Sequence, residues 1–96
     1  MKNNIEVEIC TFSLESCLNA QLAGASRVEL CSGMYDGGTT PSAAMIRMAR
    51  EKLSIQLYVM IRPRGGDFLY SDLEFEVMKE DIRFAKECRA DGVVLG

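Results

Sequence analysis

The stretch IQLYVMIRPRGGDFLYSDLE, residues 55–74, contains a strand, a charged loop and the start of a helix in direct succession. Residues 55–61 form a short apolar run with β-branched and aromatic side chains, which is typical of a buried strand. The loop at 62–70 carries two arginines, two glycines and an aspartate. Ser71 and Glu74 have the spacing of a capping box, which predicts that a helix begins there. The stretch is therefore one strand–loop–helix unit with charged groups at the carboxyl end of its strand.

The same unit recurs along the whole chain of 96 residues. Apolar patterning predicts strands at 5–12, 27–33, 55–61 and 92–96. Capping signals predict helices that begin after Ser13, Thr40 and Ser71, with Pro41 in the first helical position of the second. A βαβαβαβ order predicts parallel strands joined by right-handed helical crossovers.

Two α/β architectures share this order, the doubly wound sheet and the (β/α)8 barrel. No GxGxxG motif follows the first strand, which removes the usual dinucleotide-binding signature of a doubly wound sheet. Barrels need about 200 residues or more. We therefore expect residues 1–96 to form the N-terminal half of a TIM-like barrel, with four parallel strands, three helices and open edge strands.

Composition and charge exclude several classes of protein. The net charge of −3 and the lack of a long basic run argue against a nucleic-acid surface. No apolar stretch approaches the roughly 18 residues of a membrane-spanning helix, and the start lacks a secretory segment, so we expect a cytoplasmic protein. The chain contains no histidine, which excludes an imidazole base, a Ser-His-Asp triad and an imidazole metal ligand within this segment.

Alternation along the first three strands predicts one polar face. Residues at every second position are apolar and should pack against the helices. The opposite positions carry charged groups and thiols close to the carboxyl ends of the strands, where barrels have their sites. The side chains expected to share this interior are those of Glu8, Cys10, Glu29, Cys31 and Arg62.

The charged interior has two interpretations. In the first, an ion-pair network orders the strands, with Arg62 and Arg64 neutralised by carboxylates. In the second, the interior binds a phosphate or carboxylate, because arginines beside glycine N–H groups suit an anion. The anion-binding candidates are Arg62, Arg64, Gly65 and Gly66. The candidate acids or bases, which are also the carboxylates of the first interpretation, are Glu8, Glu29 and Asp67.

The four cysteines fall into two pairs by position. Cys17 and Cys88 lie on helices and are expected to be small core residues. Cys10 and Cys31 lie on the polar face of consecutive strands, which are about 4.8 Å apart in a parallel sheet. Without histidine, two thiolates favour Cu(I), and zinc is possible with added carboxylates. The alternative is a pair of inert buried thiols.

Three motifs together resemble the CutC copper homeostasis family over essentially the whole chain. They are EVEICTFSLESCLNAQLAGASRVELCSG at 6–33, GGTTPS at 37–42 and VMIRPRGGDFLYSD at 59–72. The resemblance implies a TIM-like barrel, a role in copper handling and Cu(I) binding by thiols. The cysteines that match the family's motifs are Cys10 and Cys31.

Two functions are consistent with these observations. The first is a cytoplasmic copper homeostasis protein of the CutC type that binds Cu(I) through Cys10 and Cys31. The second is a barrel enzyme or binding protein for a small phosphorylated or carboxylated metabolite held by the arginine–glycine loop. The residues leave both an enzymatic and a non-enzymatic role open. The open strand edges also lead us to expect a homo-oligomer.

Overall fold

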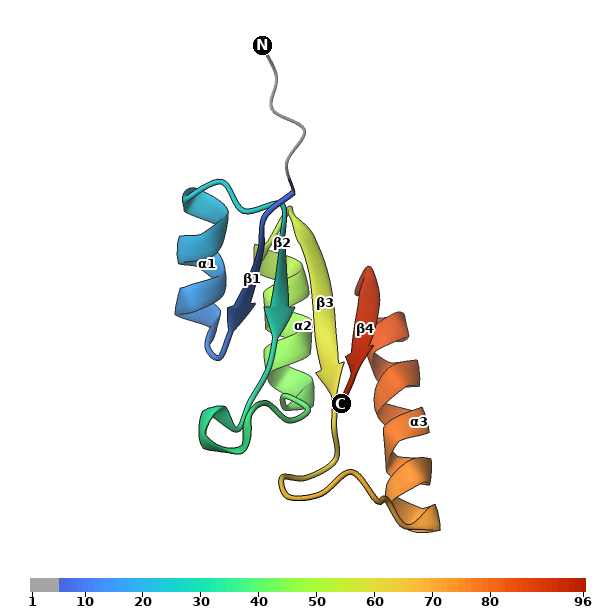
Figure 1. Ribbon diagram of the computed structural model, residues 1–96. Coiled ribbons are helices and arrows are strands. Elements are labelled where there is room, and N and C mark those ends of the chain that lie inside the picture. The colour runs from blue at the N-terminus through green and yellow to red at the C-terminus, as the bar shows by residue number, and fades with distance from the viewer. Residues whose placement is uncertain (1–5) are drawn as a thin grey trace.

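A computed structural model of the chain describes residues 6–96 (Figure 1). The strands are β1 (Glu8–Thr11), β2 (Arg27–Leu30), β3 (Gln56–Ile61) and β4 (Gly92–Leu95). The helices are α1 (Leu14–Leu22), α2 (Ala43–Lys52) and α3 (Asp72–Glu87), with a short 3-10 helix η1 (Met34–Asp36) in the β2–α2 loop. All neighbouring strands are parallel in the order β1-β2-β3-β4. The predicted four parallel strands and three helices are confirmed.

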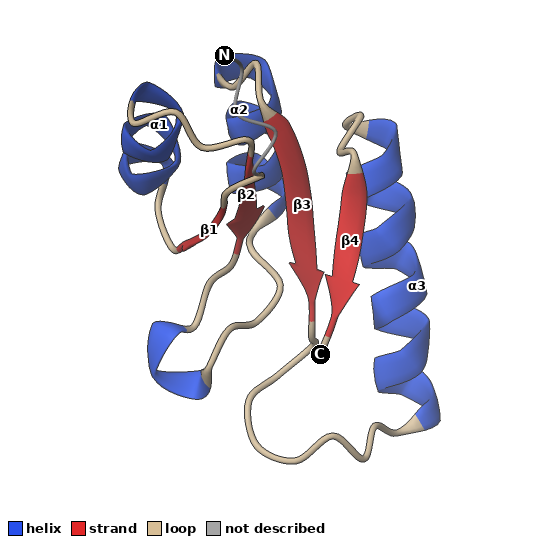
Figure 2. Ribbon diagram, turned by 45° about the horizontal axis from the view of Figure 1, so that its top comes forward, coloured by secondary structure: helices blue, strands red, loops and turns tan. Residues whose placement is uncertain are grey.

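All three helices cover the same face of the sheet, as Figures 1 and 2 show. Right-handed crossovers between consecutive strands place every helix on one face of the sheet. A doubly wound sheet instead reverses its strand order and has helices on both faces. Cys17 of α1, Ile46 of α2 and Met78 of α3 join one hydrophobic core with the strands. The strand side chains in that core are fully buried, and they are Val28, Leu30, Leu57, Val59 and Ile61. Sequential order with one-sided helices is the arrangement of a barrel wall.

The other face of the sheet, which we call the inner face, has no covering helix within residues 6–96. Strand register confirms the predicted alternation, because Cys10 pairs with Glu29 and Glu29 pairs with Tyr58. The inner-face side chains are those of Glu8, Cys10, Arg27, Glu29, Cys31, Tyr58, Met60 and Arg62. None of the helices among residues 6–96 combines the length and the apolar composition of a membrane span.

The capping signals located two of the three helices correctly. The Ser13 side chain accepts from Ser16 N at 3.0 Å at the start of α1. Ser71 and Glu74 form the complete capping box of α3. Three apolar side chains on the three helices are exposed, and they are Leu22, Met48 and Phe75.

The predicted start of α2 was wrong by two residues. Ser42 is the N-cap and accepts from Met45 N, so Pro41 precedes the helix. Thr40 does not cap the helix. Its hydroxyl accepts a hydrogen bond from Arg62 N at 2.8 Å and donates one to Arg62 O at 3.1 Å. This contact continues the strand-like pairing past the end of β3 and joins the β2–α2 loop to the β3–α3 loop.

The predicted strands at 5–12 and 27–33 are shorter in the structure, because pairing stops where each loop turns away from the sheet. Ile5 lies outside the described residues. Val7 and Ile9 are partly exposed, at 45% and 36%, because β1 is an edge strand with a neighbour on one side within residues 6–96.

Candidate functional site

Cys10 and Cys31 lie side by side on the inner face, as strand alternation predicted. Cys10 is directly opposite Glu29, and Cys31 follows two residues later on the same face of that strand. The two Sγ atoms are 3.7 Å apart. The Cys31 thiol is also 3.6 Å from Glu29 Oε1, to which it donates. One ligand atom from each of these three residues lies within 4.8 Å of the others, and we call them the thiol cluster.

The two thiols of the cluster differ in their access to solvent. Cys10 is exposed, whereas Cys31 is fully buried. Burial raises the pKa of the Cys31 thiol well above its ordinary value, and the neighbouring Cys10 and the charge of Glu29 raise it further. Cys31 is therefore protonated in the metal-free protein near neutral pH. A metal ion that binds this sulfur must displace the proton.

The donor set of the thiol cluster fits a thiophilic metal ion. In a tetrahedral site with metal–sulfur bonds of about 2.3 Å, two sulfurs lie about 3.8 Å apart. The observed 3.7 Å separation therefore needs little rearrangement. Soft thiolates select Cu(I) or zinc, and a carboxylate such as that of Glu29 is a ligand that zinc accepts.

Cys17 and Cys88 have the structural roles that were predicted for them. Cys17 is buried in the helix-facing core, and its Sγ lies 3.1 Å from Thr11 Oγ1. Burial raises the pKa of the Cys17 thiol, while the contact with Thr11 opposes this shift. Cys88 is half-buried and packs against the same core. Neither thiol reaches the inner face.

Glu8 is paired with an arginine that sequence reasoning did not select. Its carboxylate lies 2.7 Å from Arg27 Nε, and the Arg27 guanidinium stacks over the Tyr58 ring at 4.4 Å. Glu8 and Arg27 are direct partners in the parallel register, so the pairing of β1 with β2 brings them together. The expected neutralisation of Arg62 or Arg64 by Glu8 and Glu29 is absent from the ion pairs of residues 6–96.

Arg62 is buried and holds two loops together. Its Nη1 donates to the carbonyl oxygens of Asp36 and Gly38, and its Nη2 donates to the carbonyl of Gly66 at 2.9 Å. Phe68 stacks on the guanidinium at 4.8 Å. Only 6% of the residue is exposed, and Nε is buried without a hydrogen-bond partner among the described residues. Its charge has no carboxylate within ion-pair distance in that same part of the chain.

Arg64 lies in the β3–α3 loop and orders it through bonds to residues of the same loop and of α3. Its Nε lies 2.5 Å from Glu74 Oε2, and its Nη2 lies 3.1 Å from Asp67 Oδ1. A backbone hydrogen bond from Ser71 lowers the pKa of Glu74, and the bond from Arg64 lowers it further. The capping-box glutamate therefore anchors both the helix and the loop. The Asp67–Arg64 pair agrees with the ion-pair interpretation, whereas anion binding by Arg62, Arg64, Gly65 and Gly66 stays a prediction.

Comparison with known proteins agrees with this arrangement. Residues 5–96 match the model of the CutC family. This chain belongs to the CutC family. The mouse copper homeostasis protein cutC homolog is 55% identical over 94 residues, which are 98% of this chain and 35% of the mouse protein. CutC of Bacteroides fragilis is 58% identical over 97 residues, which are 100% of this chain and 38% of that protein.

A crystal structure of CutC from Streptococcus agalactiae has the same backbone arrangement. It matches with a TM-score of 0.89 at 46% identity, and the match covers 96% of this chain and 45% of that one. The four strands and their helices thus belong to a TIM-barrel-like fold. The chain spans a little more than a third of the length of the curated CutC relatives it matches.

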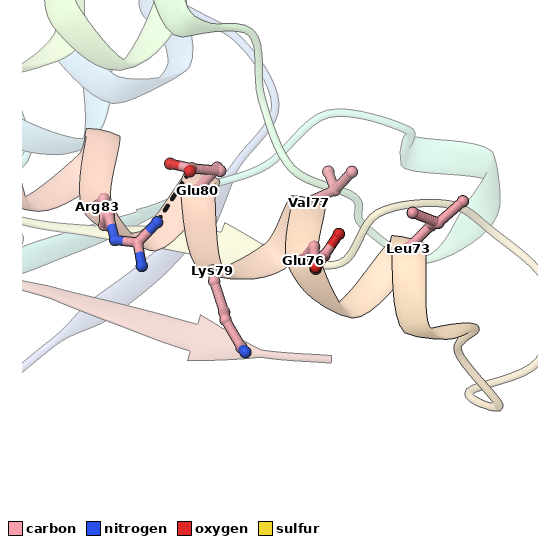
Figure 3. Close-up of a pocket in the computed structure, with 6 residues that line it drawn as sticks. All are labelled: Leu73, Glu76, Val77, Lys79, Glu80 and Arg83. Atoms are coloured by element: carbon pink, nitrogen blue, oxygen red, sulfur yellow. Dashed lines mark hydrogen bonds and ion pairs between the residues drawn. The ribbon is translucent and has the colours of Figure 1, made fainter.

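A separate groove lies on the exposed side of α3 (Figure 3). Its lining residues are Leu73, Glu76, Val77, Lys79, Glu80 and Arg83. Arg83 is paired with Glu80 at 2.8 Å, and both side chains are largely exposed. None of the predicted site residues lines this groove, and it is remote from the thiol cluster because α3 packs its other side on the sheet.

Proposed function

We propose that this CutC-family chain is part of a cytoplasmic copper homeostasis protein that binds one Cu(I) ion through the thiolates of Cys10 and Cys31. The observation that carries the proposal is the 3.7 Å separation of the two sulfurs on adjacent strands. The names of the mouse and Streptococcus agalactiae relatives associate those proteins with copper homeostasis. Copper is the cargo of such a protein, and soft thiolates are the ligands that Cu(I) prefers.

A competition titration tests the proposal directly. The purified chain is kept reduced and is titrated against a chromogenic Cu(I) chelator of known affinity. We expect the chain to withdraw one equivalent of Cu(I) from the chelator, with no second equivalent of comparable affinity. Failure to compete with even a weak chelator would contradict the proposal.

Copper affinity should increase with pH. The raised pKa of Cys31 keeps this thiol protonated through neutral pH, so copper binding at its sulfur releases one proton. This proton alone makes the affinity rise about tenfold per pH unit, so the rise should be at least about 100-fold between pH 6 and pH 8. Affinity is therefore lower in acid and higher in base. Competition titrations at several pH values measure this slope, and a flat profile would show that Cys31 is not deprotonated by the metal.

A second candidate function is supported by the buried charge of Arg62. A charge removed from water needs a partner, and Arg62 has neutral carbonyls as its hydrogen-bond partners and an unused Nε–H. A small phosphorylated or carboxylated metabolite at the ends of the strands would neutralise it. Glu8, Glu29 or Asp67 would then be the acid or base if the protein is an enzyme.

Thermal unfolding tests the anion-binding function. We expect phosphate or a related metabolite at tenfold its Kd to raise the Tm by about 5–10 °C. Sodium chloride at matched ionic strength is the control, and it should leave the Tm nearly unchanged. The same Tm with sulfate, phosphate and a panel of carboxylated metabolites would contradict this second function.

The remaining predictions on assembly also stay proposals. We propose that residues 1–96 form the N-terminal half of a (β/α)8 barrel and that the chain forms a homo-oligomer. Two observations support these proposals, the 45% coverage of the solved CutC structure and the free outer edges of β1 and β4 within residues 6–96. Unpaired strand edges favour association with further strands.

A further inference from the structure

The inner face carries another soft ligand beside the thiol cluster. Leu30 of β2 pairs with Val59 of β3, so the next positions on the two strands, Cys31 and Met60, are neighbours in the same register. Alternation places both side chains on the inner face. Neighbouring parallel strands are about 4.8 Å apart, so a long methionine side chain can reach the adjacent cysteine.

The ends of these two side chains both lie next to Gly38. A methyl group on the Cα of Gly38 would lie 3.5 Å from Met60 Cε and 3.7 Å from Cys31 Sγ. Gly38 has a φ of +108°, a conformation that other residues rarely adopt. The β2–α2 loop therefore leaves room next to both sulfur-bearing side chains. Met60 is only 9% exposed, which protects its sulfur from water.

We propose that the Met60 thioether is a third ligand of the Cu(I) ion held by Cys10 and Cys31. This inference rests on the copper-binding function proposed above and adds the residue that determines metal specificity. Thioethers are soft ligands that suit Cu(I), whereas structural zinc sites use cysteine, histidine and carboxylates. A neutral thioether adds affinity without releasing a proton.

In the proposed site the Met60 side chain rotates towards the thiol cluster. Its Sδ now lies on the side of β4, 3.3 Å from where a methyl group on Gly96 would be, and its terminal carbon lies on the side of Cys31. Methionine has three rotatable bonds and adapts easily to its surroundings. Rotation about the Cβ–Cγ bond moves the sulfur, and this is the motion that would turn it towards the thiol cluster.

Met60→Leu tests the proposal, because leucine has nearly the same volume but no sulfur. We expect Cu(I) affinity to fall on the order of tenfold or more, the range seen when groups that support a metal site are removed. Zn(II) affinity should not change. X-ray absorption at the copper edge should report three sulfur neighbours in the unaltered chain and two in the variant.

Met78→Leu is the matched control, because Met78 is also nearly buried, at 6%, but lies in the helix-facing core. Equal losses in the two variants, or a parallel loss of Zn(II) affinity, would assign Met60 a packing role and overturn the inference. Unchanged Cu(I) affinity and sulfur count in Met60→Leu would overturn it while the Cys10–Cys31 site stands. An unaltered chain that binds no Cu(I) would overturn both.

Discussion

Cys10→Ser is expected to abolish tight Cu(I) binding while the fold stays intact. The substitution replaces a soft sulfur with a hard hydroxyl, and the ion keeps only one of its two thiolates. Cys10 is exposed on the inner face, so its replacement leaves the helix-facing core undisturbed. The double variant Cys10→Ser/Cys31→Ser should likewise not bind. Chelator competition measures the loss, and circular dichroism verifies the fold.

Cys88→Ser is the matched control for this experiment. Cys88 is a free thiol at the end of α3, on the helix side of the sheet, and has no contact with the thiol cluster. Its replacement should leave the stoichiometry and affinity for Cu(I) unchanged. If the double variant of Cys10 and Cys31 bound Cu(I) as tightly as the unaltered chain, the thiol cluster would not be the copper site.

Arg62→Met should destabilise the protein by about 3 kcal/mol. The side chain donates to the carbonyls of Asp36, Gly38 and Gly66, and hydrogen bonds from a charged group each contribute about 1.5–3 kcal/mol. Part of that loss is offset, because the substitution removes a buried charge and the loop carbonyls can then form hydrogen bonds with water. Urea denaturation measures the free energy of unfolding.

Arg83→Met provides the comparison for Arg62→Met. Arg83 forms an exposed ion pair with Glu80 on the surface of α3, so its loss should cost less than about 1 kcal/mol. Arg62→Lys keeps the charge but not the forked donors, and should be intermediate. Equal stability of the Arg62→Met and Arg83→Met variants would show that Arg62 does not anchor the loops.

The strand faces and the thiol pair could be predicted because both depend on the simplest periodicity in proteins. Side chains alternate along a strand, so once the apolar positions of both strands are assigned to the helix side, Cys10 and Cys31 fall together on the opposite face. The capping box of α3 was similarly local, since Ser71 and Glu74 are only three residues apart. These features require no knowledge of distant loops.

The partners of Arg62 could not be predicted in this way. They are backbone carbonyls, which every residue has, and two of them are in a loop more than twenty residues earlier in the chain. A second contact of Arg62 explains the misplaced start of α2: threonine is a common N-cap residue, but the Thr40 hydroxyl bonds to the backbone of Arg62 instead. By contrast, the Glu8–Arg27 pair follows from strand register and would have been found by aligning the predicted strands.

The bonds of Arg62 also determine how the carboxyl-end loops open. One guanidinium holds the β2–α2 loop through Asp36 and Gly38 and the β3–α3 loop through Gly66. Local opening of either loop breaks bonds that also stabilise the other, so the free energy of opening is shared between them. The two loops, separate in sequence, therefore form one cooperative unit of local unfolding.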